Sequence, residues 1–264
     1  MHNPRKTAIP AALAILVAAL AQGTDSKEIQ QTIPLDRDGH LSIENYKGSI
    51  TVTTWEKPEV RMGVRIDPDG VSSDPDEMEK VALTEIRVSG SGRSVRIQSN
   101  YERLRHRHFL GIFGLGEGPL PLVHYSIQMP ATAHLEIKDY KSEIRISDLK
   151  ADLKLNTYKG TVNVAHLDGA AAVETYKGDV RLEFARFSRA SRLETYKGEI
   201  DVRLPKDSQF DLDADTGRRG DIDSEFTLAS RVGRSDSRRV APINGGGPAL
   251  RVTTYRGSLR LRPS

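Results

Sequence analysis

The sequence predicts an all-β fold, a solenoid of stacked repeats of about 18–20 residues, because a short, nearly fixed period indicates a stacked architecture. Three observations carry this prediction. The tripeptide Tyr-Lys-Gly occurs at residues 158–160, 176–178 and 196–198. Each copy is followed by alternating apolar and polar residues, which is typical of a half-buried strand. The composition, with 22 glycines, 13 prolines and almost no helical periodicity, is that of a β protein.

Looser copies of the tripeptide occur at residues 46–48, 140–142 and 255–257, so six of the eight tyrosines share this context. Each unit is predicted to hold two short strands joined at the Lys-Gly corner, where glycine supplies the positive φ that a tight corner needs. A unit this short cannot bury its own apolar face, so stacking of units must build the core.

Residues 1–21 are predicted to be a signal peptide. Arg5 and Lys6 precede an apolar run from Ile9 to Leu20, and residues 19–21 fit a small-x-small cleavage site. The run is shorter than the roughly 20 residues of a membrane span, so we expect no transmembrane span in the mature chain. We therefore expect export to the periplasm, the cell surface or the extracellular space. The chain has no cysteine, which excludes disulfides.

Two regions of one continuous domain are predicted after the signal peptide. Residues 22–122 are expected to form an N-terminal β layer with an acidic exposed loop at 67–79 and an insertion at 101–122. Residues 123–264 are expected to form the solenoid repeats. Within them, residues 208–226 resemble a degenerate copy, and residues 249–261 are expected to supply the last rung.

The tyrosines and lysines of the repeat form a candidate binding ladder. If they point outward, they make an aromatic strip beside a row of cations, suited to sugar rings and anionic groups. The alternative is that the tyrosines only close the corner of the solenoid, since repeat positions are usually structural. The candidate residues are Tyr140, Lys141, Tyr158, Lys159, Tyr176, Lys177, Tyr196 and Lys197.

A second candidate site is an apolar, glycine-rich stretch inside the insertion. Exposed apolar clusters often mark interaction surfaces, so this stretch is a candidate partner loop. The alternative is that it folds over an end of the stack. Its apolar residues are Phe109, Leu110, Ile112, Phe113 and Leu115.

No catalytic, metal or cofactor site is predicted. His106, His108 and His124 lack carboxylates at a telling spacing, and neighbouring arginines repel cations. Without the signal peptide the net charge is close to zero, and export makes a nucleic-acid partner less favoured still.

Several segments together resemble a known bacterial family. They are residues 43–52 (IENYKGSITV), 174–180 (ETYKGDV), 194–200 (ETYKGEI) and 245–261 (GGGPALRVTTYRGSLRL). They are similar to those of exported β-strand-repeat proteins named putative adhesins, otherwise labelled a domain of unknown function. The resemblance covers nearly the whole mature chain and implies a single-stranded, right-handed β-helix-like fold, without catalytic residues.

The first functional hypothesis is therefore a non-enzymatic structural or adhesin-like binding module of the cell envelope. Its expected partner is an envelope polysaccharide or another envelope protein. One alternative is a polysaccharide-binding or polysaccharide-active β-helix protein, since such enzymes use Lys or Arg beside carboxylates and aromatic residues. Another is an accessory or sensor subunit that docks a membrane partner through the insertion.

Overall fold

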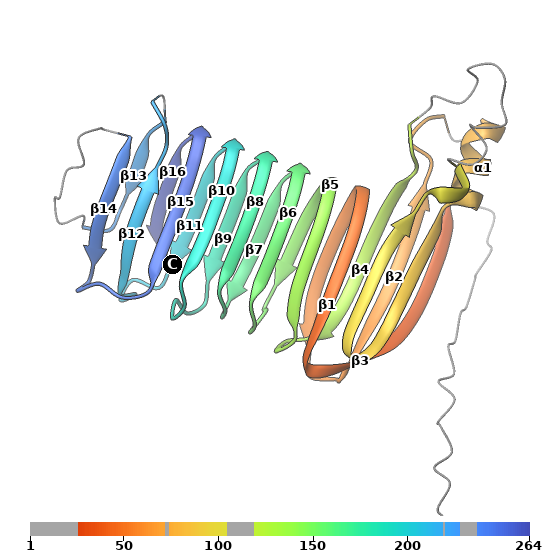
Figure 1. The fold of residues 1–264 in the computed structure, drawn as a ribbon, viewed down its shortest axis with the longest axis horizontal. Coiled ribbons are helices and arrows are strands. Elements are labelled where there is room, and N and C mark those ends of the chain that lie inside the picture. The colour runs from red at the N-terminus through yellow and green to blue at the C-terminus, as the bar shows by residue number, and fades with distance from the viewer. Residues whose placement is uncertain (1–25, 72–73, 105–118, 219, 228–236) are drawn as a thin grey trace, which may run out of the picture.

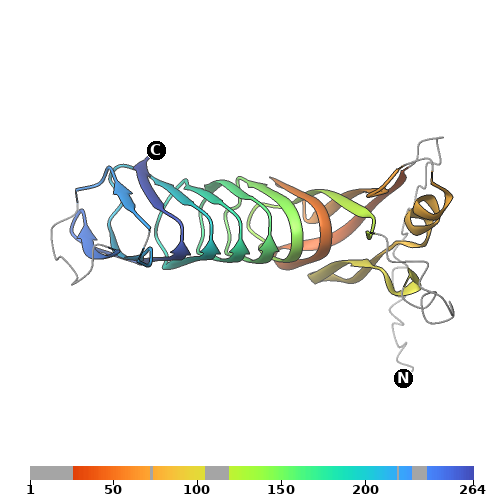
Figure 2. The same ribbon diagram turned by 90° about the horizontal axis from the view of Figure 1, so that it is seen from above.

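The computed structural model describes residues 26–71, 74–104, 119–218, 220–227 and 237–264. Within these ranges the chain forms an elongated, flattened body of sixteen strands and one helix (Figures 1 and 2). The elements are β1 (Lys27–Trp55), β2 (Glu59–Asp67), α1 (Pro75–Leu83), β3 (Glu85–Asn100), β4 (Leu122–Pro130), β5 (His134–Ser147), β6 (Leu153–Lys159), β7 (Val162–Leu167), β8 (Ala171–Lys177), β9 (Val180–Phe184), β10 (Ser191–Lys197), β11 (Ile200–Leu204), β12 (Phe210–Asp215), β13 (Ile222–Ser224), β14 (Arg238–Ile243), β15 (Ala249–Arg256) and β16 (Leu259–Pro263).

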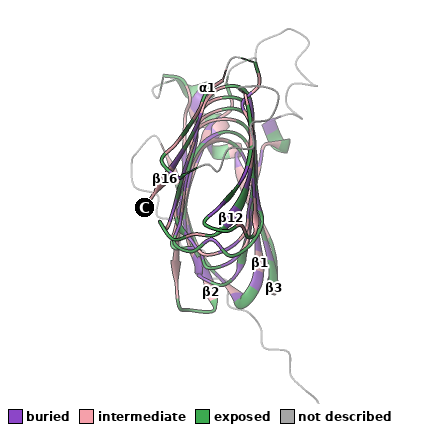
Figure 3. Ribbon diagram, turned by 90° about the vertical axis from the view of Figure 1, so that its left-hand side faces the viewer, coloured by how far each residue is buried: buried purple, intermediate pink, exposed green. Residues whose placement is uncertain are grey.

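All sixteen strands belong to one sheet, which is largely parallel and curves round until it is nearly closed (Figure 3). Strand β5 bends at its middle and joins the two faces. Its first half pairs with β6, which leads through β8, β10 and β15 along one face. Its second half pairs with β7, which leads through β9, β11 and β16 along the other.

The alternation of apolar and polar residues in the sequence corresponds to an alternation of buried and exposed side chains along the strands. In β6, Leu153 and Leu155 point inward and Lys154 is exposed, as a strand with one buried face requires. The inward residues of both faces meet in one apolar core, purple in Figure 3. Because each unit contributes only a few of these residues, burial depends on the neighbouring units.

Equivalent residues of successive units are direct partners. Leu155 of β6 pairs with Val173 of β8, and Val173 pairs with Leu193 of β10, so each step across the sheet is one repeat along the chain. The glycine corner makes this close approach possible. Gly160 has a φ of +129°, and a Cβ there would lie 1.9 Å from the carbonyl oxygen of Ser142.

The N-terminal strands extend the same sheet. Residues 40–45 and 47–52 of β1 pair with the two halves of β5. On the far side of β1, β3 pairs with residues 41–44 and β4 pairs with residues 48–55. Strand β2 then runs antiparallel to both β1 and β4, which ends the parallel stack.

The C-terminal end corrects the predicted order of the units. Residues 249–261 are not the last rung, because β15 lies between β10 and β12, and β16 pairs with both β11 and β13. The unit that carries Tyr255 thus stacks directly on the unit that carries Tyr196. The degenerate unit, β12 and β13, is placed outside it, and β14 runs antiparallel to β12 at that end (Figure 1).

The acidic loop predicted at 67–79 is also corrected, since its second half belongs to helix α1. Asp74 caps the helix by accepting from the amide of Asp76, Pro75 opens the first turn, and Val81 is buried. Because of this helix, the fold is mostly β, where the sequence predicted an all-β chain. No helix in the described ranges is long and apolar enough to cross a membrane.

Candidate functional site

Six tyrosines form a continuous stack along one long edge of the sheet. The ring centroids of Tyr46 and Tyr140 are 4.8 Å apart, and the three following neighbours repeat this at 4.9–5.0 Å, with ring planes within 7° of parallel. Tyr255 continues the stack beyond Tyr196 at 5.7 Å, tilted by 36°. We call Tyr46, Tyr140, Tyr158, Tyr176, Tyr196 and Tyr255 the tyrosine stack.

The stack leaves ring edges, rather than ring faces, open to solvent. The five rings from Tyr46 to Tyr196 are only 36–40 % exposed, because each face is covered by a neighbouring ring. Tyr101 covers the first ring edge-on, with centroids 6.1 Å apart. The rings in the middle of the stack therefore cannot stack face to face on sugar rings, which is the contact that the sequence suggested.

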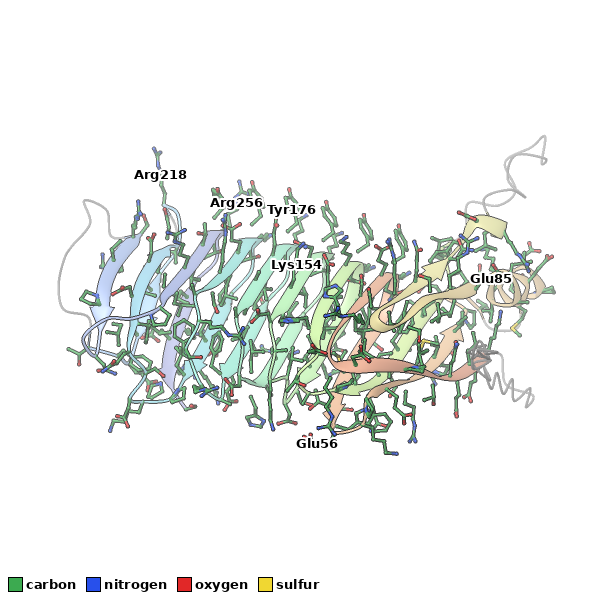
Figure 4. All side chains as sticks on the ribbon, turned by 60° about the horizontal axis from the view of Figure 1, so that its bottom comes forward. Glu56, Glu85, Lys154, Tyr176, Arg218 and Arg256 are labelled. Carbon is green, nitrogen blue, oxygen red and sulfur yellow. The ribbon has the colours of Figure 1, made fainter. Side chains whose placement is uncertain are left out.

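A row of cations runs beside the tyrosine stack. The residues that follow each tyrosine are direct strand partners in the order Lys47, Lys141, Lys159, Lys177, Lys197 and Arg256. We call these six residues the cation row, and the edge that carries both rows the ladder edge. The side chains of Tyr176 and Arg256 project from the same long edge in Figure 4.

Among the described residues, most of the cation row has no carboxylate partner. Lys47 forms an ion pair with Asp69. In the part of the chain that the structure describes, none of Lys141, Lys159, Lys177, Lys197 and Arg256 is paired with a carboxylate. Two of these lysines contact rings: Lys177 Nζ lies 5.7 Å from the ring centre of Tyr176, and Lys159 Nζ lies 5.9 Å from that of Tyr158.

Three carboxylates that lie beside the cation row in sequence or in the groove have contacts of their own. Glu143 forms an ion pair with Arg145. Glu199 lies 3.3 Å from Arg260, and the Oδ1 of Asp179 accepts a hydrogen bond from the backbone N–H of Glu199 at 2.9 Å. None of these contacts is with a residue of the cation row.

A buried polar row underlies the tyrosine stack, and it was not predicted as part of the site. The residues that precede the tyrosines are strand partners: Asn45, Asp139, Thr157, Thr175, Thr195 and Thr254. Asp139 is the one carboxylate among these six residues. Burial raises its pKa to about 6, although Ser142 and Thr157 donate hydrogen bonds to it. Burial likewise raises the pKa of Tyr101 to about 12.

Two shallow grooves, each of about 660 Å³, flank the ladder edge. One lies beside the tyrosines and is lined by Tyr158, Tyr176, Tyr196, Asn156, Glu174 and Glu194 among others. The other lies beside the lysines, where Lys141, Lys177, Lys197, Glu143 and Asp179 surround the glycine corners. A chain-like ligand lying along the edge would thus meet hydroxyls, amides and ammonium groups.

The structure brings all eight residues of the candidate binding ladder together. The stack also takes in Tyr46 and Tyr255, and the cation row takes in Lys47 and Arg256. The sequence repeats at 46–48 and 255–257 were the signal for these additions. The candidate partner loop, Phe109, Leu110, Ile112, Phe113 and Leu115, lies outside the described residues. Of the three histidines considered, His124 is described, and no group of three His, Asp or Glu side chains in the described ranges could hold a metal ion.

The fold and the ladder define a class of mostly β repeat proteins with a solvent-facing aromatic and cationic edge. The family described as Toastrack DUF4097 matches residues 13–262, nearly the whole chain. The chain belongs to this family, and the resemblance to bacterial putative adhesins is confirmed at the level of the family. No curated protein matches the sequence.

Several solved structures are similar to this chain. A putative cell adhesion protein from Clostridium sporogenes is 12 % identical, with a TM-score of 0.50 over 90 % of this chain and all of that one. A putative adhesin from Bacteroides fragilis is 12 % identical, with a TM-score of 0.43 over 90 % of this chain and 97 % of that one. A putative lipid binding protein from Parabacteroides distasonis is 11 % identical, with a TM-score of 0.30 over 90 % and 96 %. At 12 % identity, the similarity to the Clostridium sporogenes protein concerns the fold alone.

Proposed function

We propose that this protein is an exported, non-enzymatic, adhesin-like binding module of the bacterial cell envelope, and that its ladder edge binds an envelope polymer. One observation carries the proposal: five cations that have no carboxylate partner within the described part of the chain lie in register beside an exposed tyrosine stack. Binding of this kind uses an extended edge rather than an enclosed pocket.

An unpaired row of like charges has an energetic cost that an anionic ligand would remove. Like charges directly opposite on neighbouring strands destabilise a sheet. Here the same cation recurs on successive strands, and three neighbouring carboxylates are held by Arg145, Arg260 and a backbone N–H group. A ligand with repeated negative groups would offset the repulsion and gain charge-assisted hydrogen bonds at each strand.

The repetition of the candidate residues favours binding over catalysis. General acid–base chemistry needs particular groups with matched pKa values at one place. On the ladder edge, tyrosine is copied from strand to strand, and lysine is copied on every strand except the one that carries Arg256, so no single position is set apart as a catalytic group. The alternative of a polysaccharide-active enzyme has less support than a polysaccharide-binding surface.

We further infer that the nearly closed sheet is a right-handed, single-stranded solenoid with repeats of about 18–20 residues, a short period of the kind that stacked architectures use. Its support is the register, in which residues of β5, β6 and β8, and likewise of β5, β7 and β9, pair with their equivalents in the next unit. The same pairing continues to β10 and β11. A protein of this shape presents the same edge at every repeat, which suits a polymeric ligand.

Export rests on the sequence of residues 1–21. Arg5 and Lys6 precede the apolar run, and a small-residue site follows it. Fractionation of cells that produce the full chain, with mass spectrometry of the N-terminus, tests this inference. A chain found intact in the cytoplasm would contradict it.

The binding proposal is tested by the charge of the ladder edge. The purified protein is applied to a panel of envelope and extracellular glycans beside two triple variants. Lys159→Gln, Lys177→Gln and Lys197→Gln remove three charges from the cation row, and Lys57→Gln, Lys150→Gln and Lys206→Gln remove three exposed charges elsewhere. We expect the first variant alone to lose binding while its circular dichroism is unchanged. Equal binding by both variants would overturn the proposal.

A further inference from the structure

We propose that the ligand of the ladder edge is a linear glycan with repeating carboxylates, a polyuronate, which lies along the edge with about one sugar on each strand. This inference rests on the proposed function and names the ligand class for the same surface.

The spacing of the edge suits an extended sugar chain. Neighbouring rings of the tyrosine stack are 4.8–5.0 Å apart from Tyr46 to Tyr196, which is the strand spacing of the sheet. One pyranose ring in an extended glycan advances the chain by nearly the same length. A uronate polymer can therefore keep about one sugar near each strand over several strands, and those of its carboxylates that face the edge can reach the cation row.

The orientation of the tyrosine rings determines which of their groups a ligand can contact. Because the ring faces are covered within the stack, the edge offers phenol hydroxyls and aromatic C–H groups. Hydroxyls on this spacing can donate to and accept from sugar hydroxyls. A nucleic acid or other ligand that binds through base stacking needs open aromatic faces, and these are closed from Tyr46 to Tyr196.

The flanking residues favour a narrow polymer over a flat anionic surface. Glu174 and Glu194 lie in the groove on the tyrosine side, and Glu143 and Asp179 lie in the groove on the lysine side. An anionic membrane surface wide enough to meet the cation row would also meet these carboxylates. A single glycan chain can contact the row while its carboxylates stay clear of both flanks.

The experiment measures binding of oligogalacturonides of defined length to the purified protein by isothermal titration calorimetry. We expect the affinity to rise with length until the oligomer spans the five unpaired cations, because linked contacts act together. Methyl-esterified oligomers of equal length, which lack the charges, should not bind. Added salt should weaken binding, since exposed charge pairs are screened.

Variants of the cation row test whether the oligogalacturonides bind there. Lys159→Gln, Lys177→Gln and Lys197→Gln together should weaken binding roughly tenfold or more, since three exposed charge pairs with the ligand are lost. The variant with Lys57→Gln, Lys150→Gln and Lys206→Gln should bind like the parent protein.

Inorganic polyphosphate distinguishes a wrong ligand class from a wrong proposed function. If polyphosphate binds through the cation row and the oligogalacturonides do not, the glycan assignment is wrong and the binding module stands. If methyl-esterified oligomers bind as well as the charged ones, the carboxylates are not recognised and the inference is overturned. If no glycan or polyanion binds in a way that the cation-row variant weakens, both the ligand class and the proposed function are wrong.

Discussion

Tyr140 and Tyr158 occupy the same position in successive repeats and stack with their ring centroids 5.0 Å apart and their planes 4° from parallel. One step along the repeat thus equals one step across the sheet. The same ring has two roles, because its faces hold neighbouring strands in register while its edge and hydroxyl remain in solvent. A structural role and a binding role are therefore compatible at these positions.

The stacking role predicts a difference between two substitutions of Tyr176, which has a ring on either side. Tyr176→Ser removes both stacked contacts, each worth about 0.5–1.5 kcal/mol, and should lower the free energy of unfolding by about 1–3 kcal/mol. Tyr176→Phe keeps the ring and should change it by less than about 0.5 kcal/mol. Urea unfolding of both variants measures this difference. Equal destabilisation would show that the hydroxyl, not the ring, stabilises the stack.

The glycine corner predicts a steric effect at Gly160. A methyl group there would lie 1.9 Å from the Ser142 carbonyl oxygen, at a φ of +129°, so Gly160→Ala should destabilise by more than about 2 kcal/mol. Gly63→Ala is the matched control, since the nearest atom to a Cβ at Gly63 is 3.8 Å away. Thermal unfolding compares the two. If Gly160→Ala and Gly63→Ala have the same melting temperature, the corner accommodates the methyl group without loss of stability.

The pairing register of the repeat strands and the ladder edge could be predicted from the sequence, because both follow from a local repeat. Tyrosine, lysine and glycine recur once in each unit, and alternation around them assigns the inward face. The position of β15 could not be predicted in this way, because a unit stacks on the best-matching neighbour rather than on the preceding one. Tyr255 matches Tyr196 better than Thr216 does, since it continues the ring stack.

Two further features depended on tertiary structure. The acidic segment before Leu83 looked like a loop because it contains proline and many charges, yet Asp74 and Pro75 are also helix-starting residues. Asp139 occupies a place where later units have threonine, and only its burial within the stacked fold raises its pKa. Neither property follows from the repeat pattern.

Asp139 predicts a pH dependence of stability. Burial raises its pKa in the folded protein to about 6, above its usual 3.8, so the folded state holds this proton more tightly than the unfolded chain. Its stabilising contribution is complete below its usual pKa and is lost as the pH rises through about 6, by about 2–3 kcal/mol.

Asp139→Asn isolates that contribution because the amide does not ionise. Relative to the parent protein, the variant should become more stable as the pH is raised from 4 to about 7, whatever its constant hydrogen-bonding cost. Melting temperatures of both proteins across this range measure the effect. Parallel curves would mean that Asp139 titrates at its ordinary pKa.

The cation row predicts that salt stabilises the free protein. Screening should reduce repulsion among Lys159, Lys177 and Lys197, so added salt should raise the melting temperature. Replacing these three lysines by glutamine should raise it by about 1–3 °C at low salt and reduce the response to salt. The variant with glutamine at 57, 150 and 206 should keep the parental response. If both variants respond alike, the repulsion is not specific to the ladder edge.

The order of strands at the C-terminal end predicts which elements depend on β15. Val252 is buried in β15 between β10 and β12, so Val252→Asp places a charge inside the core there and should expose β12 and β14 to solvent. Val240 of β14 is 46 % exposed, and Val240→Asp is the control that should leave the end intact. Hydrogen exchange of the β12 amides distinguishes the arrangements. Because β12 pairs with β15 and not with β10, its protection should fall in Val252→Asp. If the units stacked in chain order, β12 would stay protected and only residues 249–264 would exchange faster.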